Sequence, residues 1–177
     1  MMGTKKLIFV ALFAAITALF AQLILPLPFS PVPVNLALLS PILAGRLFGV
    51  KVALLSQLLY ISLGALGLPV FAAFGGGFGV LLGPGGGFLW GYLLVAFFCG
   101  QRKFPQKNSL FADGAVMCLS VLSCYLCGSL WYAFVTKTAF LASLPLCVLP
   151  FLPGDALKIA AGLYLTRKLA PLDKKWA

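Results

Sequence analysis

The sequence predicts an all-α integral membrane protein that forms a bundle of six transmembrane helices. Two observations lead to this fold class. Of the 177 residues, 62% are hydrophobic and 9% are charged, with a mean hydropathy of +1.09, which is more apolar surface than a soluble core of this length requires. The apolar residues also gather in runs that suit spans of about 20 residues. The whole chain, residues 1–177, is predicted to be a single domain.

The six predicted spans are separated by proline, glycine or charged residues. They cover Leu7–Leu27, Val34–Leu47, Val52–Leu66, Phe88–Gly100, Gly114–Phe134 and Pro153–Leu169. Pro26 and Pro28 are expected to end the first span. Pro41 lies inside the short second span, which is therefore expected to kink or to be partly re-entrant. Thr136–Leu149 is expected to be the last loop.

Basic residues are distributed unevenly between the two sides of the predicted bundle. Eleven of the 13 Lys and Arg residues flank the spans on one side, whereas Lys137 alone lies on the other and Lys158 lies within the last span. Cytoplasmic loops of membrane proteins carry an excess of Lys and Arg, so both termini are predicted to be cytoplasmic. Because the cations do not form one patch, the net charge of +10 is interpreted as a topology pattern, and no nucleic-acid partner is expected.

A glycine-rich apolar stretch, Gly64–Gly87, is predicted to be a loop on the outer side. Each glycine destabilises a helix by about 1 kcal/mol relative to alanine, and the stretch is dense in them. It carries Phe71, Phe74 and Phe78 instead of the Ser or charged residues of an aqueous linker. We therefore expect a loop embedded in the membrane or capping it, with its backbone close to a ligand.

The chain lacks the groups that most enzyme mechanisms need. It contains no His and no Glu, and no phosphate-binding loop motif occurs. Cys124 and Cys127 have the spacing of a metal or redox motif, but in an apolar span without partners they are expected to be buried free thiols. Intramembrane hydrolysis needs a nucleophile with a base, paired carboxylates or a metal ion. An intramembrane enzyme is therefore the weaker alternative, and neither a metal nor a cofactor is expected.

The stretch Pro150–Lys158 holds the most informative pair of charges. Asp155 is the only one of the three acidic residues at the start of an apolar span, and Lys158 follows three residues later on the same helical face. Ionisable groups inside a membrane are costly and usually functional. The pair either neutralises itself to anchor a helix end or binds a ligand, and we favour the ligand. A pocket that opens to the outer side and holds one carboxylate and one amine is predicted.

Two further patterns have two explanations each. Gln57 and Tyr60 share one face of the third span and either line a pocket or hydrogen-bond to neighbouring helices. Small residues at four-residue spacing let another helix approach closely, and that helix belongs either to this chain or to a partner. In the first span these residues are Ala11, Ala14, Ala15 and Ala18.

Over nearly its whole length the sequence resembles the BioY family, the biotin-specific S components of energy-coupling-factor (ECF) vitamin transporters. The most specific motifs are Gly67–Ala72 (GLPVFA), residues 76–91 around Gly83-Pro84, and Pro150–Lys158 (PFLPGDALK), and Pro31–Val34 resembles the family's first outer loop. The resemblance implies a six-helix bundle of the ECF S-component type. It also implies a multi-pass protein of the bacterial cytoplasmic (inner) membrane that binds biotin from outside.

The resemblance further implies which residues meet biotin and which meet partners. Asp155 would accept hydrogen bonds from the ureido N–H groups, and Lys158 would donate to the ureido carbonyl or to the tail carboxylate. The predicted biotin-binding residues are Asp155, Lys158, Asn35, Tyr60, Phe71, Phe74, Gly76, Gly77 and Phe88. The alanine stripe is similar to the motif that docks S components on a transmembrane coupling subunit (EcfT-like), and two cytosolic ATPases would then drive release inward.

Two motifs depart from the family's pattern. Asn35 and Ala37 stand where the family usually has Thr and Gln, and Gly85 and Phe88 replace Thr and Tyr of Gly-Pro-Thr-Gly-Gly-Tyr. Asn35 is expected to supply an amide to the pocket. An S component for another small vitamin is the alternative that keeps the architecture.

Overall fold

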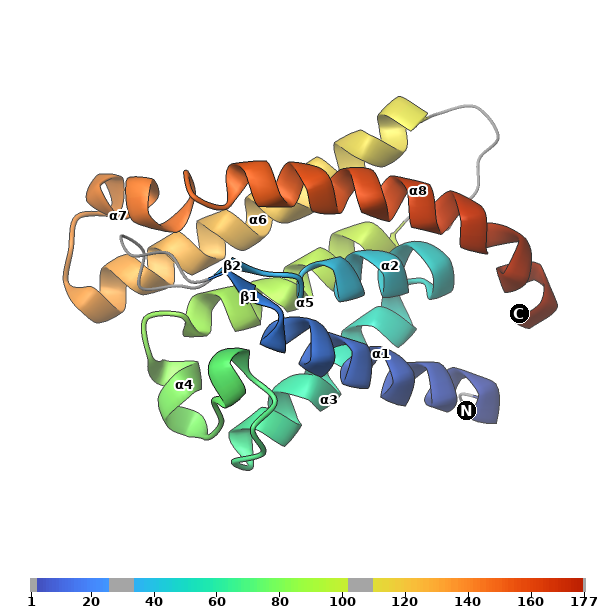
Figure 1. The fold of residues 1–177 in the computed structure, drawn as a ribbon, viewed down its shortest axis with the longest axis horizontal. Helices are drawn as coiled ribbons and strands as arrows, with labels where there is room; N and C mark the ends of the chain where they lie inside the picture. The colour runs from blue at the N-terminus through green and yellow to red at the C-terminus, as the bar shows by residue number, and fades with distance from the viewer. Residues whose placement is uncertain (1–2, 26–33, 102–109, 177) are drawn as a thin grey trace.

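The computed structural model describes residues 3–25, 34–101 and 110–176, and it shows a helical bundle (Figure 1). In that part of the chain, the helices of ten or more residues coincide with the six segments predicted as spans. They are α1 (Thr4–Gln22), α2 (Leu39–Phe48), α3 (Val50–Ala65), α5 (Gly86–Gly100), α6 (Leu110–Thr136) and α8 (Leu152–Trp176).

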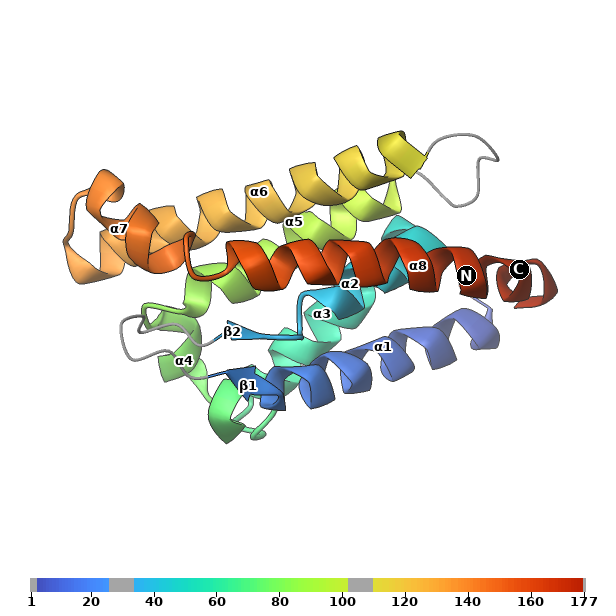
Figure 2. The ribbon, with the colours of Figure 1, turned by 45° about the horizontal axis from the view of Figure 1, so that its top comes forward.

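Shorter elements cap one end of the bundle. They are β1 (Ile24–Leu25), β2 (Val34–Asn35), the 3-10 helix η1 (Ala72–Phe74), α4 (Phe78–Leu82) and α7 (Phe140–Cys147). The two strands pair antiparallel, with Ile24 opposite Asn35. Both chain termini lie at the other end, as two views of the ribbon show (Figures 1 and 2).

Helix α5 lies at the centre and packs against α2, α3 and α6, while α1 packs on α3 and α8 on α2. Small residues permit the closest of these approaches. A Cβ atom added at Gly91 of α5 would lie 2.6 Å from the Cys124 sulfur of α6, so a side chain there would push the two helices apart. The buried apolar residues of these helices form the core between them.

Several predicted boundaries are wrong by a few residues. The first span was predicted to run to Leu27, but α1 ends at Gln22. The second was predicted to begin at Val34, but α2 begins at Leu39 because Val34 and Asn35 form β2 instead. The prolines expected to end the first span, Pro26 and Pro28, and the motif at 31–33 lie outside the described residues.

Two predictions about proline and loops are also corrected. Pro41 lies in the first turn of α2, where its missing N–H has no helical partner to lose, so it neither kinks nor breaks the helix. The segment Thr136–Leu149 was expected to be a loop, yet it contains α7. The glycine-rich stretch is mostly irregular, but it includes α4, and α5 begins at Gly86 and Gly87.

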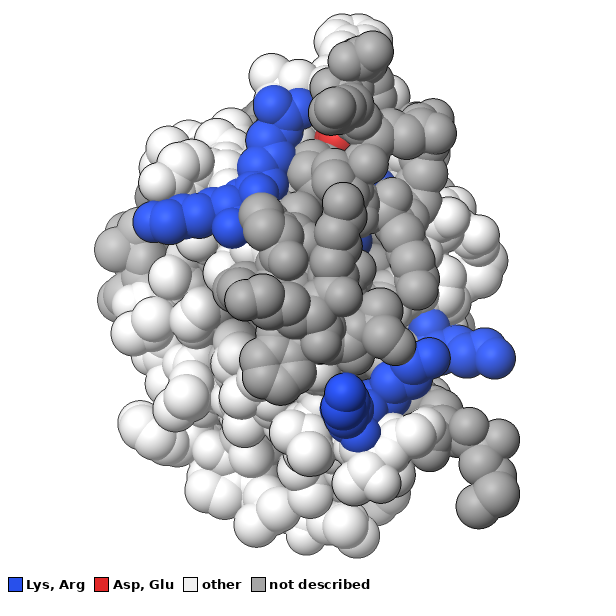
Figure 3. Space-filling model, turned by 90° about the vertical axis from the view of Figure 1, so that its right-hand side faces the viewer, with Lys and Arg blue, Asp and Glu red and all other residues white. Residues whose placement is uncertain are grey.

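Exposed basic side chains gather at the end of the bundle that carries both termini (Figure 3). In the described part of the chain, the exposed cations near this end are Lys5, Lys6, Lys51, Arg167 and Lys168. Arg46 also comes from this end, but it is fully buried and paired with Asp113 of α6. Arg46, one of the eleven cations counted as flanking the predicted spans, is therefore buried between helices and not exposed to solvent.

Two described helices, Thr4–Gln22 and Leu110–Thr136, are long and apolar enough to cross a membrane by length and composition. Phe140–Cys147 and Leu152–Leu169 form a third such unit if the pair, bent by 61°, is one span. Helices α2, α3 and α5 are apolar but shorter. The chain is thus a helical protein with the composition of a membrane protein.

Candidate functional site

A cavity of about 380 Å³ lies at the end of the bundle opposite the termini. This volume falls within the usual range for small-molecule sites. Residues from β2, η1, α4, α5, α6 and α8 contribute to its wall. The lining residues are Asn35, Leu38, Phe71, Ala72, Ala73, Gly79, Val80, Gly83, Pro84, Gly85, Phe88, Leu89, Tyr92, Cys124, Tyr125, Phe151, Asp155 and Lys158.

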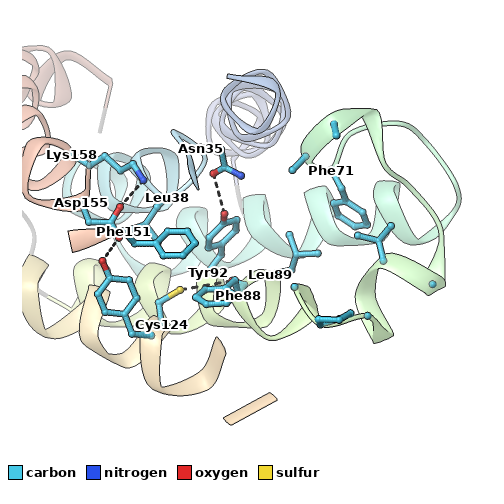
Figure 4. Close-up of a pocket in the computed structure, with 18 residues that line it drawn as sticks. Asn35, Leu38, Phe71, Phe88, Leu89, Tyr92, Cys124, Phe151, Asp155 and Lys158 are labelled. Carbon is cyan, nitrogen blue, oxygen red and sulfur yellow. Dashed lines mark hydrogen bonds and ion pairs between the residues drawn. The ribbon is translucent and has the colours of Figure 1, made fainter. Parts of the chain in front are cut away.

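One end of the cavity is charged (Figure 4). Asp155 lies in the first turn of α8, where the helix dipole favours an anion. Lys158, one turn later, donates to Asp155 Oδ1 at 2.5 Å, and the Tyr125 hydroxyl of α6 donates to Asp155 Oδ2. Asp155 and Lys158 are 3% and 5% exposed. An ion pair so deeply buried must be satisfied by hydrogen bonds, and here Tyr125 supplies the additional donor.

Polar groups also occur at the middle of the cavity. Asn35 Oδ1 accepts from the backbone N–H of Ala37 at 3.1 Å, which fixes the side chain just before α2. The Tyr92 hydroxyl points toward the same oxygen from α5, at 3.5 Å (Figure 4). Asn35 and Tyr92 thus place an amide and a hydroxyl group in the cavity wall.

The remaining wall is apolar and largely aromatic. Phe88 of α5 stacks on Phe151, with ring centroids 5.7 Å apart and planes 19° from parallel. Leu89, Val80 and Pro84 continue this surface. Such a cavity suits a ligand with a compact polar head and an apolar body.

The segment between α3 and α4 closes the cavity at its apolar end. Phe71 is 1% exposed, and its ring packs edge-on against Tyr60 at 5.5 Å between centroids. A Cβ atom at Gly64 would lie only 2.0 Å from the same ring. Only glycine therefore allows the Phe71 ring to lie on α3 at this point.

The cavity brings together five of the nine predicted ligand-binding residues. Asp155, Lys158, Asn35, Phe71 and Phe88 line it. The other four lie outside its lining, for separate reasons. Tyr60 is buried behind Phe71, and Phe74 is 72% exposed and points away from the core.

Gly76 and Gly77 shape the segment rather than line the cavity. A Cβ atom at Gly76 would lie 2.5 Å from the Leu68 carbonyl oxygen, and Gly77 has a φ of +87°. Both positions therefore require glycine for backbone reasons.

Residues that sequence reasoning missed complete the site. Tyr125 and Tyr92 are polar aromatic residues within apolar helices, and Tyr92 lies one turn after Phe88 on the same face of α5. That spacing was visible in the sequence, but the partners of the two hydroxyl groups were not. Phe151 belongs to the predicted motif at 150–158 but was not assigned a role. Its stacking on Phe88 depends on how the turn before α8 lies against α5, which is a tertiary contact.

Three other residues considered in the sequence analysis are Gln57, Cys124 and Cys127. Gln57 and Cys124 are buried in the bundle, and Cys127 is only partly buried. Gln57 donates to Thr17 of α1 at 3.1 Å and does not line the cavity, so it bonds to a neighbouring helix. Cys124 lines the cavity, with its sulfur 3.8 Å from the Phe88 carbonyl oxygen. Cys124 and Cys127 are both free thiols, and Cys124 is buried as expected, whereas Cys127 is half-buried.

The alanine stripe of α1 divides between two faces. Ala14 is 3% exposed and Ala18 packs against the core, so this pair is used within the chain. Ala11 and Ala15 are exposed. The outward-facing pair, and not Ala14 with Ala18, is therefore available to another helix.

Comparisons with known proteins agree with one another. The family model described as the BioY family matches residues 1–175. A protein named probable biotin transporter BioY from Pyrococcus horikoshii is 37% identical over 95% of this chain and 98% of its own length. The biotin transporter BioY of Lactococcus lactis subsp. cremoris is 31% identical over 82% of this chain and 79% of its own.

A solved structure is similar throughout the fold. It is described as the S-component for biotin from an ECF-type ABC transporter, and it superimposes with a TM-score of 0.87 at 28% sequence identity. The similarity covers 96% of this chain and 94% of the other.

Proposed function

The chain belongs to the BioY family, and from this premise we propose that it is the S component of an ECF transporter that binds biotin in the cavity. It is a transport component and not an enzyme. The observation that carries the proposal is the buried Asp155–Lys158 pair at one end of an otherwise apolar cavity. Biotin has matching parts, since its ureido ring carries two N–H donors and one carbonyl acceptor, and its thioether ring and tail are apolar.

The charged end favours the ureido ring over the tail carboxylate. A ligand carboxylate placed there would lie beside the Asp155 carboxylate, and like charges at short range repel strongly when buried. A neutral ureido group avoids this repulsion. Asp155 accepts from its N–H groups, Lys158 donates to its carbonyl, and these hydrogen bonds gain strength from the charges. The thioether ring then packs against the apolar wall to which the stacked Phe88 and Phe151 rings belong.

Calorimetric titration of the purified protein in detergent tests the assignment, together with mass spectrometry of the small molecule that co-purifies. Biotin is expected in both measurements. Biotin methyl ester is expected to bind with similar affinity, because the ester changes only the tail. A large loss of affinity for the ester would indicate that Lys158 binds the tail carboxylate of biotin and not the ureido carbonyl. A different bound vitamin, with no biotin titration, would overturn the function.

We also propose a multi-pass arrangement in a bacterial cytoplasmic membrane, with six spans and both termini inside. The exposed cations at the end that carries the termini support this orientation. In a variant without native cysteines, Lys168→Cys should be labelled from the cytoplasm and Lys137→Cys from outside. Labelling of both from one side would contradict the model. Positions 30 and 107, the labelling sites suggested by the sequence, lie outside the described residues.

The coupling partners follow from the same premise. We propose that Ala11 and Ala15 dock on an EcfT-like transmembrane subunit, which two cytosolic ATPases drive. Both alanines are exposed on α1, and small side chains let a second helix approach closely.

A further inference from the structure

Gln22, the last residue of α1, contacts a segment about 50 positions further along the chain. Its Nε2 lies 3.0 Å from the carbonyl oxygen of Phe71 and 3.3 Å from that of Val70. Its Oε1 accepts from the backbone N–H of Phe74 at 2.9 Å. Both ends of this one amide are therefore used on the segment 70–74.

The segment 70–74 is part of the cavity wall. Phe71, Ala72 and Ala73 line the cavity at its apolar end. The Phe71 ring on α3 also holds the segment, together with short-range backbone hydrogen bonds. In these the Phe71 N–H donates to the Gly75 carbonyl at 2.9 Å, the Gly75 N–H to the Ala72 carbonyl at 3.1 Å, and the Val70 N–H to the Leu68 carbonyl at 2.8 Å.

The backbone of this wall is strained. Ala73 and Phe74 each have a φ of +56°, in the left-handed region that residues other than glycine rarely adopt. Such conformations persist only where surrounding contacts hold them. Phe74 cannot supply these contacts through its ring, which is 72% exposed. The Gln22 amide bonds the carbonyl before this bend and the N–H within it, so it holds the bend on both sides.

We propose that Gln22 is a positioning residue that ties this wall of the cavity to the end of α1 and thereby retains the ligand. The identity of the ligand rests on the proposed function. Gln22 does not line the cavity, so its effect on the ligand passes through the backbone of residues 71–73. Loss of the amide frees the wall, and the ligand leaves faster while the bundle stays folded.

The test compares variants in detergent by the dissociation rate of biotin and by thermal unfolding. Gln22→Met keeps the length of the side chain and removes both hydrogen-bonding ends. It should raise the dissociation rate about tenfold, the size expected from losing one or two neutral hydrogen bonds. Gln22→Glu keeps the acceptor for the Phe74 N–H but removes both donors, and it should also accelerate dissociation.

Gln57→Met is the matched control. Gln57 is a fully buried amide of α3 that bonds to Thr17 and Ser56 and is not among the residues that line the cavity. Its loss should lower the unfolding temperature and leave the dissociation rate within about twofold, as expected of a contact away from the site. A wild-type dissociation rate in Gln22→Met, or an equal acceleration in Gln57→Met, would refute the positioning role.

Hydrogen exchange of the ligand-free protein separates this proposal from the identity of the ligand. Gln22→Met should increase exchange at the amides of residues 71–77, Phe74 above all, and Gln57→Met should not. If the wild-type protein does not bind biotin, the proposed function fails, and this exchange measurement still decides the role of Gln22. Unchanged exchange in Gln22→Met overturns it.

Discussion

The two buried ion pairs of the described structure differ in what they join. Asp155 and Lys158 are three residues apart on one helix, and they open onto the cavity. Arg46 and Asp113 are 67 residues apart, join α2 to α6 near the end that carries the termini, and do not line the cavity. The first pair cannot hold two helices together by itself, whereas the second pair can.

This difference separates a binding role from a structural one. A buried pair contributes little net stability when its desolvation is counted, but breaking it by removing one partner is strongly destabilising. The charged groups of a pair that faces a cavity can form hydrogen bonds with a ligand. Those of a pair packed between helices are out of reach of a ligand. The two pairs should therefore respond oppositely to matched substitutions.

The largest effect is expected on stability when the inter-helix pair is broken. Arg46→Met leaves the Asp113 carboxylate buried without its main partner and should lower the free energy of unfolding by about 3–5 kcal/mol. Arg46→Met/Asp113→Leu removes both charges and should recover most of that loss. Denaturant unfolding in detergent measures both. If the double variant is no more stable than the single one, the pair is not the cause.

A large effect on binding is expected at the other pair. Asp155→Asn removes the anion that accepts from the ligand N–H groups and should weaken biotin binding by about 2–5 kcal/mol, measured by calorimetry. Asp113→Asn would not be a neutral control, because Asp113 is buried and paired with Arg46.

The double variant Arg46→Met/Asp113→Leu serves as that control and should bind biotin with wild-type affinity. The reverse comparison is as informative, because Asp155→Leu/Lys158→Met should stay folded and lose binding. Equal affinity of Asp155→Asn and the wild type would remove Asp155 from the site.

A smaller loss is expected at Tyr125. Tyr125→Phe removes the donor to Asp155 Oδ2 and keeps the ring, so binding should weaken by about 1.5–3 kcal/mol, the usual contribution of a hydrogen bond to a charged group. Calorimetry with biotin checks this value. Tyr132→Phe, on the same helix and outside the cavity lining, should leave the affinity unchanged, and a loss there would point to a general effect of α6.

The smallest effect on binding is expected on the outer face of α1. Ala15→Trp should leave biotin affinity unchanged, because Ala15 is exposed and does not line the cavity. It should abolish co-purification with the coupling subunit and ATP-dependent uptake, since a bulky side chain prevents close helix approach. Leu122→Trp, at an exposed position of α6, is the control for added bulk. Wild-type uptake by Ala15→Trp would exclude this docking face.

The sequence by itself determined the features that depend on neighbouring residues. Hydrophobic runs located the long helices, since helical hydrogen bonds and membrane burial are local to a segment. The spacing of Asp155 and Lys158 predicted their pairing, because residues three apart share a helical face. Asn35 was identified as a pocket amide from its place in a motif.

Only the tertiary structure decided which distant residues meet. In the sequence, Arg46 is one of the cations that flank the predicted spans. Only the packing of α2 and α6 shows that it pairs with Asp113. Tyr125 reaches Asp155 across 30 residues, and Gln22 reaches Phe74 across 52. The orientation of α1 in the bundle buries Ala14 and leaves Ala15 exposed. No periodicity records such pairings, because they depend on how helices cross and on the side-chain volumes between them.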